Sequence, residues 1–388
     1  MKLVMIGHGH VGSVMRTLLE RESSIDSIMC VDRTRPKRLS RKVRFVTLDA
    51  RDAKPLNAFL ASENPDVVVN TALPVTNENL LRSCLKIRSH YLDLASYWDV
   101  DTNAKARCPY RVEQLDYSDR FAEKKLIGVI NAGVSPGLTN MLARECADHL
   151  DRVESIRIRL FEDTQTDVLE FPWSVEWLLD ELNTKPLAYE NGHYIIRESF
   201  SEEESFTFPN PLGRRRVCLI AQEEIGTIPH YITTENIDIK SYDNQTEGAK
   251  VLLRAGLLGE EPVRIGTQKI TPTEFISQLV EQRRTNTPIS PNARFALVVE
   301  ADGVRDHRAV TVRISAVFPN EGAIEKLGLG ANFVSYPTAL VAALTLTHYP
   351  RITRYGVYPP EALEHNVHKA ILNELKEHVP IGRRTKST

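Results

Sequence analysis

The first twelve residues constrain the fold of this chain more than any other segment. An apolar run, Lys2 to Ile6, leads into Gly7, Gly9 and Gly12, which are spaced G-x-G-x-x-G, and a helix pattern follows from Val11 to Leu19. A short apolar run bounded by glycines is typical of a buried strand. Glycines at this spacing permit a tight turn, let the backbone approach a pyrophosphate, and let the helix pack closely on the strand. We therefore predict a Rossmann-type turn whose helix amino terminus faces the phosphates of a dinucleotide.

Asp32 supplies the second half of this fingerprint. It follows the next predicted strand, Ser27 to Val31, and lies about 20 residues after Gly12, where a carboxylate can accept hydrogen bonds from ribose hydroxyls. His10 and Val11, inside the turn, are further candidate cofactor-binding residues. The alternative is a glycine turn in some other α/β fold, but strand, helix and acid are all in register for NAD or NADP.

The residues after Asp32 leave the choice between the two cofactors open. Asp32 favours NAD, because a carboxylate would repel a 2′-phosphate. An arginine beside the ribose instead accommodates NADP, and Arg33 begins a basic run. That run comprises Arg33, Arg35, Lys37, Arg38, Arg41, Lys42 and Arg44. A charge run is also typical of a solvated loop, so we expect NAD, with NADP possible and with Arg33 near the ribose.

The spacing of apolar segments predicts the architecture. Strand and helix patterns alternate through the first third of the chain, which is typical of a doubly wound parallel sheet. Beyond about Asn140, Ile156 and Ile158 alternate with Arg157 and Arg159, as in a half-buried strand with one wet face. Phe295–Ala301 and Ala309–Phe318 flank Asp302-Gly303 and predict a hairpin. The fold class is therefore α/β: a Rossmann-type doubly wound parallel sheet plus a second α+β domain with a mixed or antiparallel sheet.

The end of the chain is expected to return to the first domain. Ala331 to Leu346 is rich in alanine and apolar residues, so this helix must be buried. We predict a dinucleotide-binding domain over 1–137, a substrate-binding and dimerisation domain over 138–331, and a segment over 332–388 that packs on the first domain. The alternative assigns the helix wholly to the second domain. The basic tail beyond Pro380 is expected to fray.

Charge and composition exclude several classes of function. Lys and Arg total 49 against 51 Asp and Glu, a net charge of -2, which gives no general attraction to nucleic acid or to an acidic membrane. No apolar run reaches the roughly 18–20 residues of a membrane span. The five cysteines form no CxxC pair and no HExxH occurs, so we expect no metal site and a reducing, cytoplasmic location.

Several separate segments together resemble one family. They are the glycine turn, Val69–Pro74, Tyr91–Leu94, Asn131–Asn140 and Tyr355–Glu361. The chain resembles the saccharopine dehydrogenase-like family, and its segments over 133–140 and 356–361 look most like lysine 6-dehydrogenase. The family also includes carboxynorspermidine dehydrogenases. The polar stretch from Asp99 to Asp119 departs from the compact loop expected of lysine 6-dehydrogenase.

The resemblance implies a reaction and places residues around it. A hydride would pass between nicotinamide and a carbon that bears nitrogen in an amino acid or amine. The loop at the end of a central strand would hold the nicotinamide ribose through Asn70, Thr71, Ala72, Leu73 and Pro74. Pro136-Gly137 opens a helix whose amino terminus could hold a substrate carboxylate, or it is a simple turn between domains. Trp173 and Ser174 resemble residues that line the substrate side.

Amine oxidation also needs a proton acceptor. Asp93, at a strand end, is the first candidate, either for proton transfer or for binding the substrate ammonium. His230 is the second and Glu176 the third. A strand-end aspartate often caps the next helix, and a lone histidine is usually structural. We expect a homodimer, and a non-catalytic NAD(H)-binding sensor or scaffold is the alternative of another class.

Overall fold

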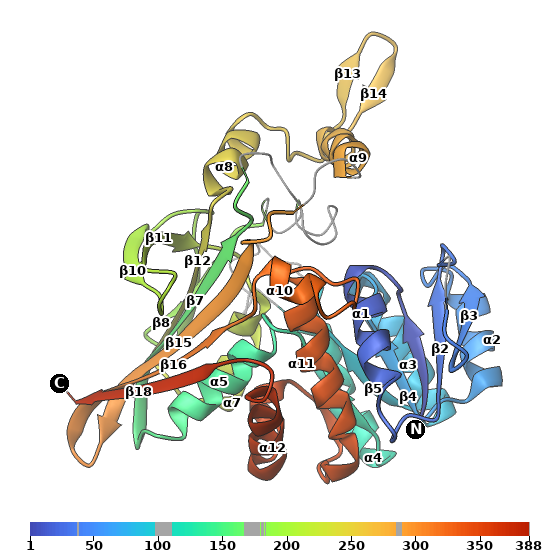
Figure 1. The fold of residues 1–388 in the computed structure, drawn as a ribbon, viewed down its shortest axis with the longest axis horizontal. Coiled ribbons are helices and arrows are strands. Elements are labelled where there is room, and N and C mark those ends of the chain that lie inside the picture. Colours follow the sequence, from blue (N-terminus) through green and yellow to red (C-terminus); the bar gives the residue numbers. More distant parts are fainter. Residues whose placement is uncertain are drawn as a thin grey trace.

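The computed structural model describes residues 1–36, 39–97, 111–166, 179, 182, 184–284 and 289–387 (Figure 1). The predicted site residues Trp173, Ser174 and Glu176 lie outside the described residues, as do Lys37 and Arg38 of the basic run.

Six strands of the amino-terminal third and one strand from near the end of the chain form a seven-stranded parallel sheet. Its order is β17-β6-β5-β4-β1-β2-β3, and every pair in it is parallel. The strands are β1 (Lys2–Ile6), β2 (Ser27–Asp32), β3 (Val43–Thr47), β4 (Val67–Asn70), β5 (His90–Asp93), β6 (Ile127–Val129) and β17 (Gly356–Tyr358); the helices are α1 (His10–Leu19), α2 (Ala53–Glu63), α3 (Asn77–Ile87) and α4 (Ser118–Glu123). From β1 the strands β2 and β3 are added on one side of the sheet, and β4, β5 and β6 are added on the other. The boundary between β1 and β4 is therefore the switch point at which such sheets bind ligands. The doubly wound sheet is confirmed.

The second sheet is mixed. It has nine strands, in the order β10-β11-β12-β7-β15-β16-β18, with β8 and β9 attached beside β12. Its strands are β7 (Arg152–Asp163), β8 (Leu187–Glu190), β9 (His193–Ile196), β10 (Glu204–Thr207), β11 (Arg214–Leu219), β12 (Asn236–Asp243), β15 (Arg294–Arg305), β16 (Arg308–Val317) and β18 (Ile381–Ser387). β12 runs parallel to β7, and the remaining pairs are antiparallel. α5 (Leu138–Ala147) packs on this sheet against β15, β7 and β16.

Shorter elements complete the second unit. They are α7 (Ile228–Tyr231), α8 (Thr246–Arg254), α9 (Pro272–Arg284), α10 (Glu321–Glu325) and the hairpin β13 (Val263–Ile265) and β14 (Gln268–Ile270). Figure 1 shows this hairpin projecting away from both sheets. None of the helices in the described part of the chain is both long and apolar enough to span a bilayer.

The last fifty residues touch both sheets. α11 (Ser335–Thr347) packs against α1 (Figure 1), and β17 pairs with β6 at the edge of the first sheet. After α12 (His365–Leu375), β18 pairs antiparallel with β16 of the second sheet. The prediction of a frayed tail was wrong, because β16 offers its backbone groups to residues 381–387. We propose that the segment from α11 to α12 belongs with the dinucleotide-binding unit, and the predicted domain bounds stay a proposal.

Two local predictions also need correction. Arg159 does not face water: it is buried, and its guanidinium donates to Asp238 (Nη2–Oδ2 2.8 Å) and to Glu204 (Nε–Oε1 2.8 Å). A charge is tolerated inside when it is paired in this way. The hairpin turns at Asp306-His307, both with φ in the left-handed region (52° and 61°), and not at Asp302-Gly303.

Gly303 marks instead a shift of register between β15 and β7. A Cβ at this position would lie 2.0 Å from the carbonyl oxygen of Arg152, which is a backbone atom. The glycine therefore allows the two strands to approach closely at an irregularity of the ladder.

We predict that Gly303→Ala lowers the free energy of unfolding by about 1–3 kcal/mol, because backbone must move to admit the methyl group. Gly382→Ala, in β18 of the same sheet, is the matched control: there a Cβ would meet Ser315 Oγ at an ordinary 3.5 Å. Urea denaturation measures both. Equal losses in the two variants would contradict the close approach.

Candidate active site

The glycine turn is built to leave room for a ligand. Gly7 has φ 92°, and a Cβ on it would lie 2.7 Å from the backbone nitrogen of Ala72. A Cβ on Gly12 would lie 2.5 Å from Thr71 Oγ1. At Gly9, the N-cap of α1, no described atom lies within 4 Å of such a Cβ. Gly7 and Gly12 thus draw the turn against the β4 loop, and Gly9 leaves the helix amino terminus open to a pyrophosphate.

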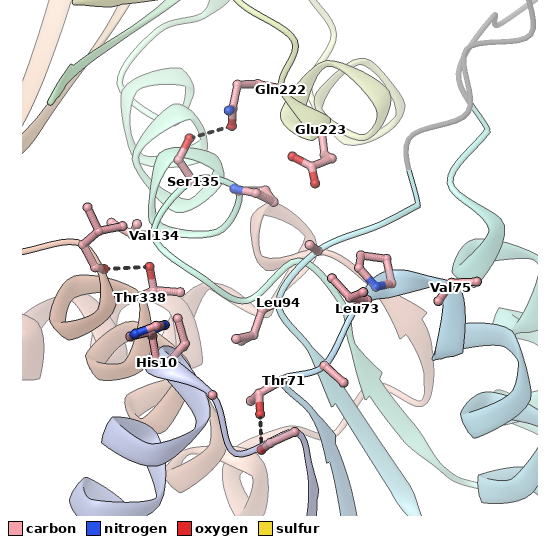
Figure 2. Close-up of a pocket in the computed structure, with 18 of the residues that line it drawn as sticks. His10, Thr71, Leu73, Val75, Leu94, Val134, Ser135, Gln222, Glu223 and Thr338 are labelled. Carbon is pink, nitrogen blue, oxygen red and sulfur yellow. Dashed lines mark hydrogen bonds between the residues drawn. The ribbon is translucent and has the colours of Figure 1, made fainter. Parts of the chain in front are cut away.

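A cavity of about 450 Å³ lies at this edge of the sheet. Figure 2 shows it lined by His10 of the glycine turn, by the loops that follow β4 and β5, and by Gln222 and Glu223 of the second unit. Such a size is usual for a small-molecule site. The predicted cofactor residues that line it are Gly7, Gly9, His10, Val11, Asp32, Arg33, Thr71, Ala72, Leu73 and Pro74. Gly12 and Asn70 lie behind the wall.

Hydrogen bonds hold the loop after β4 against the glycine turn. Thr71 Oγ1 donates to the carbonyl oxygens of Ile6 (3.0 Å) and Gly7 (2.9 Å) (Figure 2). Buried Asn70 donates through Nδ2 to Thr76 Oγ1 (3.0 Å) and Asn77 Oδ1 (2.7 Å). Asn70 was predicted to bind the cofactor, but its amide holds the loop and does not reach the cavity.

The ribose end of the cavity carries both signs of charge. Asp32 Oδ2 accepts from the backbone N–H of His8 (2.6 Å), which fixes the carboxylate at the rim. Arg33, Asp49 and Arg51 line the same end. Arg51 donates to Asp49 (Nη2–Oδ2 2.7 Å), and these hydrogen bonds lower the pKa of Asp49 to about 2.

Two of the three proton-transfer candidates, Asp93 and His230, do not line the cavity, and the third, Glu176, lies outside the described residues. Asp93 is buried behind the wall, where it accepts from Asn131 N (2.8 Å) and Gln114 Nε2 (3.1 Å). Burial raises its pKa to about 7. His230 is exposed on α7 and does not line the cavity. Asp93 points inward because backbone after β6 needs an acceptor there, so neither residue is placed to touch substrate.

The first N–H groups at the amino terminus of α5 are bonded within the protein. The N–H of Gly137 donates to Asn140 Oδ1 (2.8 Å), that of Leu138 to Gly133 O (3.0 Å), and that of Thr139 to Val134 O (3.2 Å). None of these three N–H groups is free for a substrate carboxylate, and the carboxylate site at Pro136-Gly137 stays a prediction. Pro136 itself lines the cavity.

The sequence analysis missed the polar residues that the second unit contributes. They are Glu162, Gln222, Glu223, Ser241, Asp243 and Thr246, together with Ser135 after β6. Glu162 and Asp243 are direct partners in the parallel pairing of β7 with β12. Burial raises the pKa of Asp243 to about 6, and the charge of Asp163 adds to this. The sequence signal that could have identified these cavity residues is the presence of charged residues inside apolar runs, as in Ile220–Ile225.

Two family models match nearly the whole chain. The saccharopine dehydrogenase NADP binding domain matches residues 3–129, and the saccharopine dehydrogenase C-terminal domain matches residues 133–381. The chain belongs to the saccharopine dehydrogenase family. It is an NAD(P)-dependent oxidoreductase, and the glycine turn and Asp32 fit that cofactor.

Individual relatives of this family member are distant. Carboxynorspermidine synthase of Vibrio alginolyticus is 23% identical over 264 residues, which are 66% of this chain and 62% of the relative, so the match spans less than two thirds of that protein. Carboxyaminopropylagmatine dehydrogenase of Synechocystis sp. is 24% identical over 356 residues, 88% of this chain and 87% of the relative. The apo saccharopine dehydrogenase (L-Glu forming) of Saccharomyces cerevisiae superposes over 100% of both chains, with a TM-score of 0.69 at 15% identity, and supports the fold.

The raised pKa of Asp93 predicts a pH-dependent stability in this family member. The folded protein holds the Asp93 proton up to about pH 7, whereas the unfolded chain loses it near pH 4. Between these values folding takes up a proton, so stability falls as pH rises, by at most about 1.4 kcal/mol per pH unit. Asp243 and Glu361, whose pKa values are raised to about 6 and about 7, act with the same sign.

We predict that Asp93→Asn flattens this dependence of stability on pH. The free energy of unfolding of the variant should therefore rise relative to that of the wild type as the pH increases from 5 to 8. Gln114 Oε1 has no hydrogen-bond partner in the described structure and can receive the introduced amide. Denaturant titrations across that range test the change, with exposed Glu123→Gln as control. Parallel stability profiles for the wild type and Asp93→Asn would refute it.

Proposed function

We propose that this protein transfers a hydride between NAD(P) and a carbon that bears nitrogen, in a substrate that carries several cationic amines. The observation that carries the proposal is one cavity with two chemically different ends. The glycine turn and Asp32 line one end, and the carboxyl groups of Glu162, Glu223 and Asp243 line the other.

The carboxyl groups favour a cationic substrate. Glu162 and Asp243 are adjacent across β7 and β12, and burial together with the charge of Asp163 raises the pKa of Asp243 to about 6. A bound ammonium would favour the carboxylate form of Asp243 and lower this pKa. The relatives named for carboxynorspermidine and carboxyaminopropylagmatine support an amine of this kind ahead of the lysine or saccharopine type.

The hydride chemistry would occur between the two ends. The strand ends of the first sheet place Thr71, Leu73 and Leu94 in the cavity wall. Ser135, from the segment between β6 and α5, and Gln222 of the second unit line it as well (Figure 2). The nicotinamide supplies and accepts the hydride, while the protein orients the substrate and excludes water. An apolar wall on one side and polar groups on the other suit a ring that stacks and an amine that is hydrogen-bonded.

The activity test uses carboxynorspermidine and carboxyaminopropylagmatine with NAD⁺ or NADP⁺, and follows absorbance of the reduced nicotinamide. We predict turnover of at least one of them, exceeding that of saccharopine and lysine. Glu162→Gln and Asp243→Asn should each raise KM about tenfold to a hundredfold, because a hydrogen bond to a charged group is lost. Glu247→Gln, on an exposed carboxylate of α8, should leave KM unchanged.

Cofactor binding without turnover of any of these four compounds would favour the alternative of a non-catalytic NAD(H)-binding sensor. Turnover of saccharopine or lysine alone would indicate that the substrate is an amino acid of the lysine type. Equal KM values for the two cavity variants and the control would show that these carboxyl groups do not bind the substrate.

We also propose that NAD is preferred over NADP. Asp32 at the rim would repel a 2′-phosphate, although Arg33 and Arg51 line the same end. Arg51 is already engaged by Asp49, which leaves Arg33 as the cation for a phosphate.

Asp32→Ser should therefore shift the ratio of NADP to NAD affinity toward NADP by about tenfold or more, since one repulsive charge is removed. Arg33→Ala added to Asp32→Ser should cancel most of that gain. Fluorescence titration of the reduced cofactors measures both ratios. An unchanged ratio in Asp32→Ser would place the adenosine ribose elsewhere.

We further propose a homodimer in the cytoplasm. β10 and β18 end the main path of the second sheet, and open strand edges are commonly covered by another chain. Cys30, Cys84, Cys146 and Cys218 are buried free thiols, which supports a reducing compartment.

A further inference from the structure

A second acid, Glu224, lies one residue beyond the cavity wall. It belongs to the turn Glu223–Gly226 and is fully buried, whereas its neighbour Glu223 lines the cavity. Glu224 Oε1 accepts from Ser135 Oγ (2.5 Å) and Thr139 Oγ1 (2.6 Å). Its Oε2 is buried and has no hydrogen-bond partner among the described residues. A buried carboxyl without a cation is costly unless it keeps a proton.

Ser135 connects this acid to the cavity. Ser135 lies between β6 and α5 and lines the cavity, and Figure 2 shows its side chain turned toward Gln222 (Oγ–Oε1 3.3 Å). The same hydroxyl therefore contacts Glu224 on one side and borders the substrate space on the other. It stands where the first sheet's strand ends face the second unit, which is where we place the hydride transfer.

We propose that Ser135 exchanges a proton with the substrate nitrogen, and that Glu224 is the positioning residue that holds the second proton of this relay. The inference rests on the proposed amine oxidoreductase function and assigns to it the proton path that Asp93, His230 and the α5 terminus do not provide.

The steps balance in the oxidising direction. A substrate N–H bond breaks and its proton forms a bond to Ser135 Oγ, while the Ser135 O–H bond breaks and its proton passes to the Glu224 carboxylate. The neutral amine then loses hydride, with the electron pair of the C–H bond, to the oxidised nicotinamide, and a C=N bond forms. In the reducing direction Glu224 and Ser135 return the two protons, and the nitrogen is protonated before or as the hydride arrives.

The surroundings favour a proton on Glu224 at rest. Burial raises the pKa of Glu224, and the hydrogen bonds from Ser135 and Thr139 only partly offset this. Glu223 precedes it on the same turn, and the charge of Glu224 acts on Glu361 of η5 (Pro360–Ala362). Tyr231 of α7 is affected in turn by Glu361. Arg144 of α5 donates its Nε to the backbone oxygen of Glu361 (3.0 Å).

Three variants test the relay in the full-length enzyme with carboxynorspermidine and NAD(P)⁺. Ser135→Ala removes the contact with the substrate, and Glu224→Gln keeps acceptor geometry but cannot take a proton. Both should lower kcat about a hundredfold or more, with KM and cofactor affinity nearly unchanged. Ser135→Thr should restore most of kcat. Glu361→Gln is the matched control: Glu361 is a buried acid of the same region that Ser135 does not bond in the described structure, so the variant should keep wild-type kcat.

Two readouts separate a relay from a merely structural role. The wild-type kcat for oxidation should rise with pH until Glu224 is a carboxylate, and this limb should vanish in Glu224→Gln. In mixtures of light and heavy water the wild-type rate should depend on the deuterium fraction with curvature, since two protons move, and Ser135→Ala should lose that curvature.

The outcomes decide between the hypotheses. If the wild type oxidises the amine and Glu224→Gln keeps both its kcat and its pH limb, the relay is wrong and the proposed function stands. Loss of the limb in Glu223→Gln, and not in Glu224→Gln, also overturns it in favour of direct transfer. If Glu224→Gln fails to bind cofactor, Ser135→Ala decides alone. A wild type that turns over no amine removes the proposed function and the relay with it.

Discussion

The close contact between the first turn and the loop after β4 is the constraint on which the site depends. Gly7 and Gly12 leave no space for a Cβ against Ala72 and Thr71, and Thr71 Oγ1 bonds two carbonyl oxygens of the turn. The helix amino terminus and the nicotinamide-side loop are thereby held at one distance from each other. A dinucleotide that binds the turn meets a preformed wall, so little ordering of the loop is required on binding.

The second unit contributes charge to this frame. Parallel pairing of β7 with β12 sets Glu162 beside Asp243, and the turn at Glu223–Gly226 places one acid in the cavity and the next behind it. Consecutive residues thus do different things: Glu223 can meet a cation directly, whereas Glu224 reaches the cavity through the hydroxyl of Ser135. Both carboxyl groups are buried, and their position relative to the cavity separates them.

Features that depend on local interactions can be predicted from the sequence. The glycine turn and Asp32 lie within one strand–helix–strand unit, so their spacing alone locates them. Features that depend on the direction of a side chain or on a distant partner cannot be predicted in this way. A strand end showed that Asp93 would lie at the correct edge of the sheet but not that it would turn inward to Asn131. The meeting of Glu162 with Asp243, and the burial of Arg159 between Asp238 and Glu204, depend on pairings between segments far apart in the chain. The strand β18 was missed because its basic residues carry no apolar pattern.

The position of β17 has a consequence for the way the protein is made. Its strand completes the first sheet beside β6, and Val129 is bonded to Tyr349, 220 residues further along the chain. During synthesis the amino-terminal strands emerge long before this partner exists. The edge of β6 and the face of α1 that α11 later covers therefore stay uncovered while the whole second unit is synthesised. Nascent chains of this protein are therefore most exposed to mispairing and to chaperone binding until the last tenth of the sequence has left the ribosome.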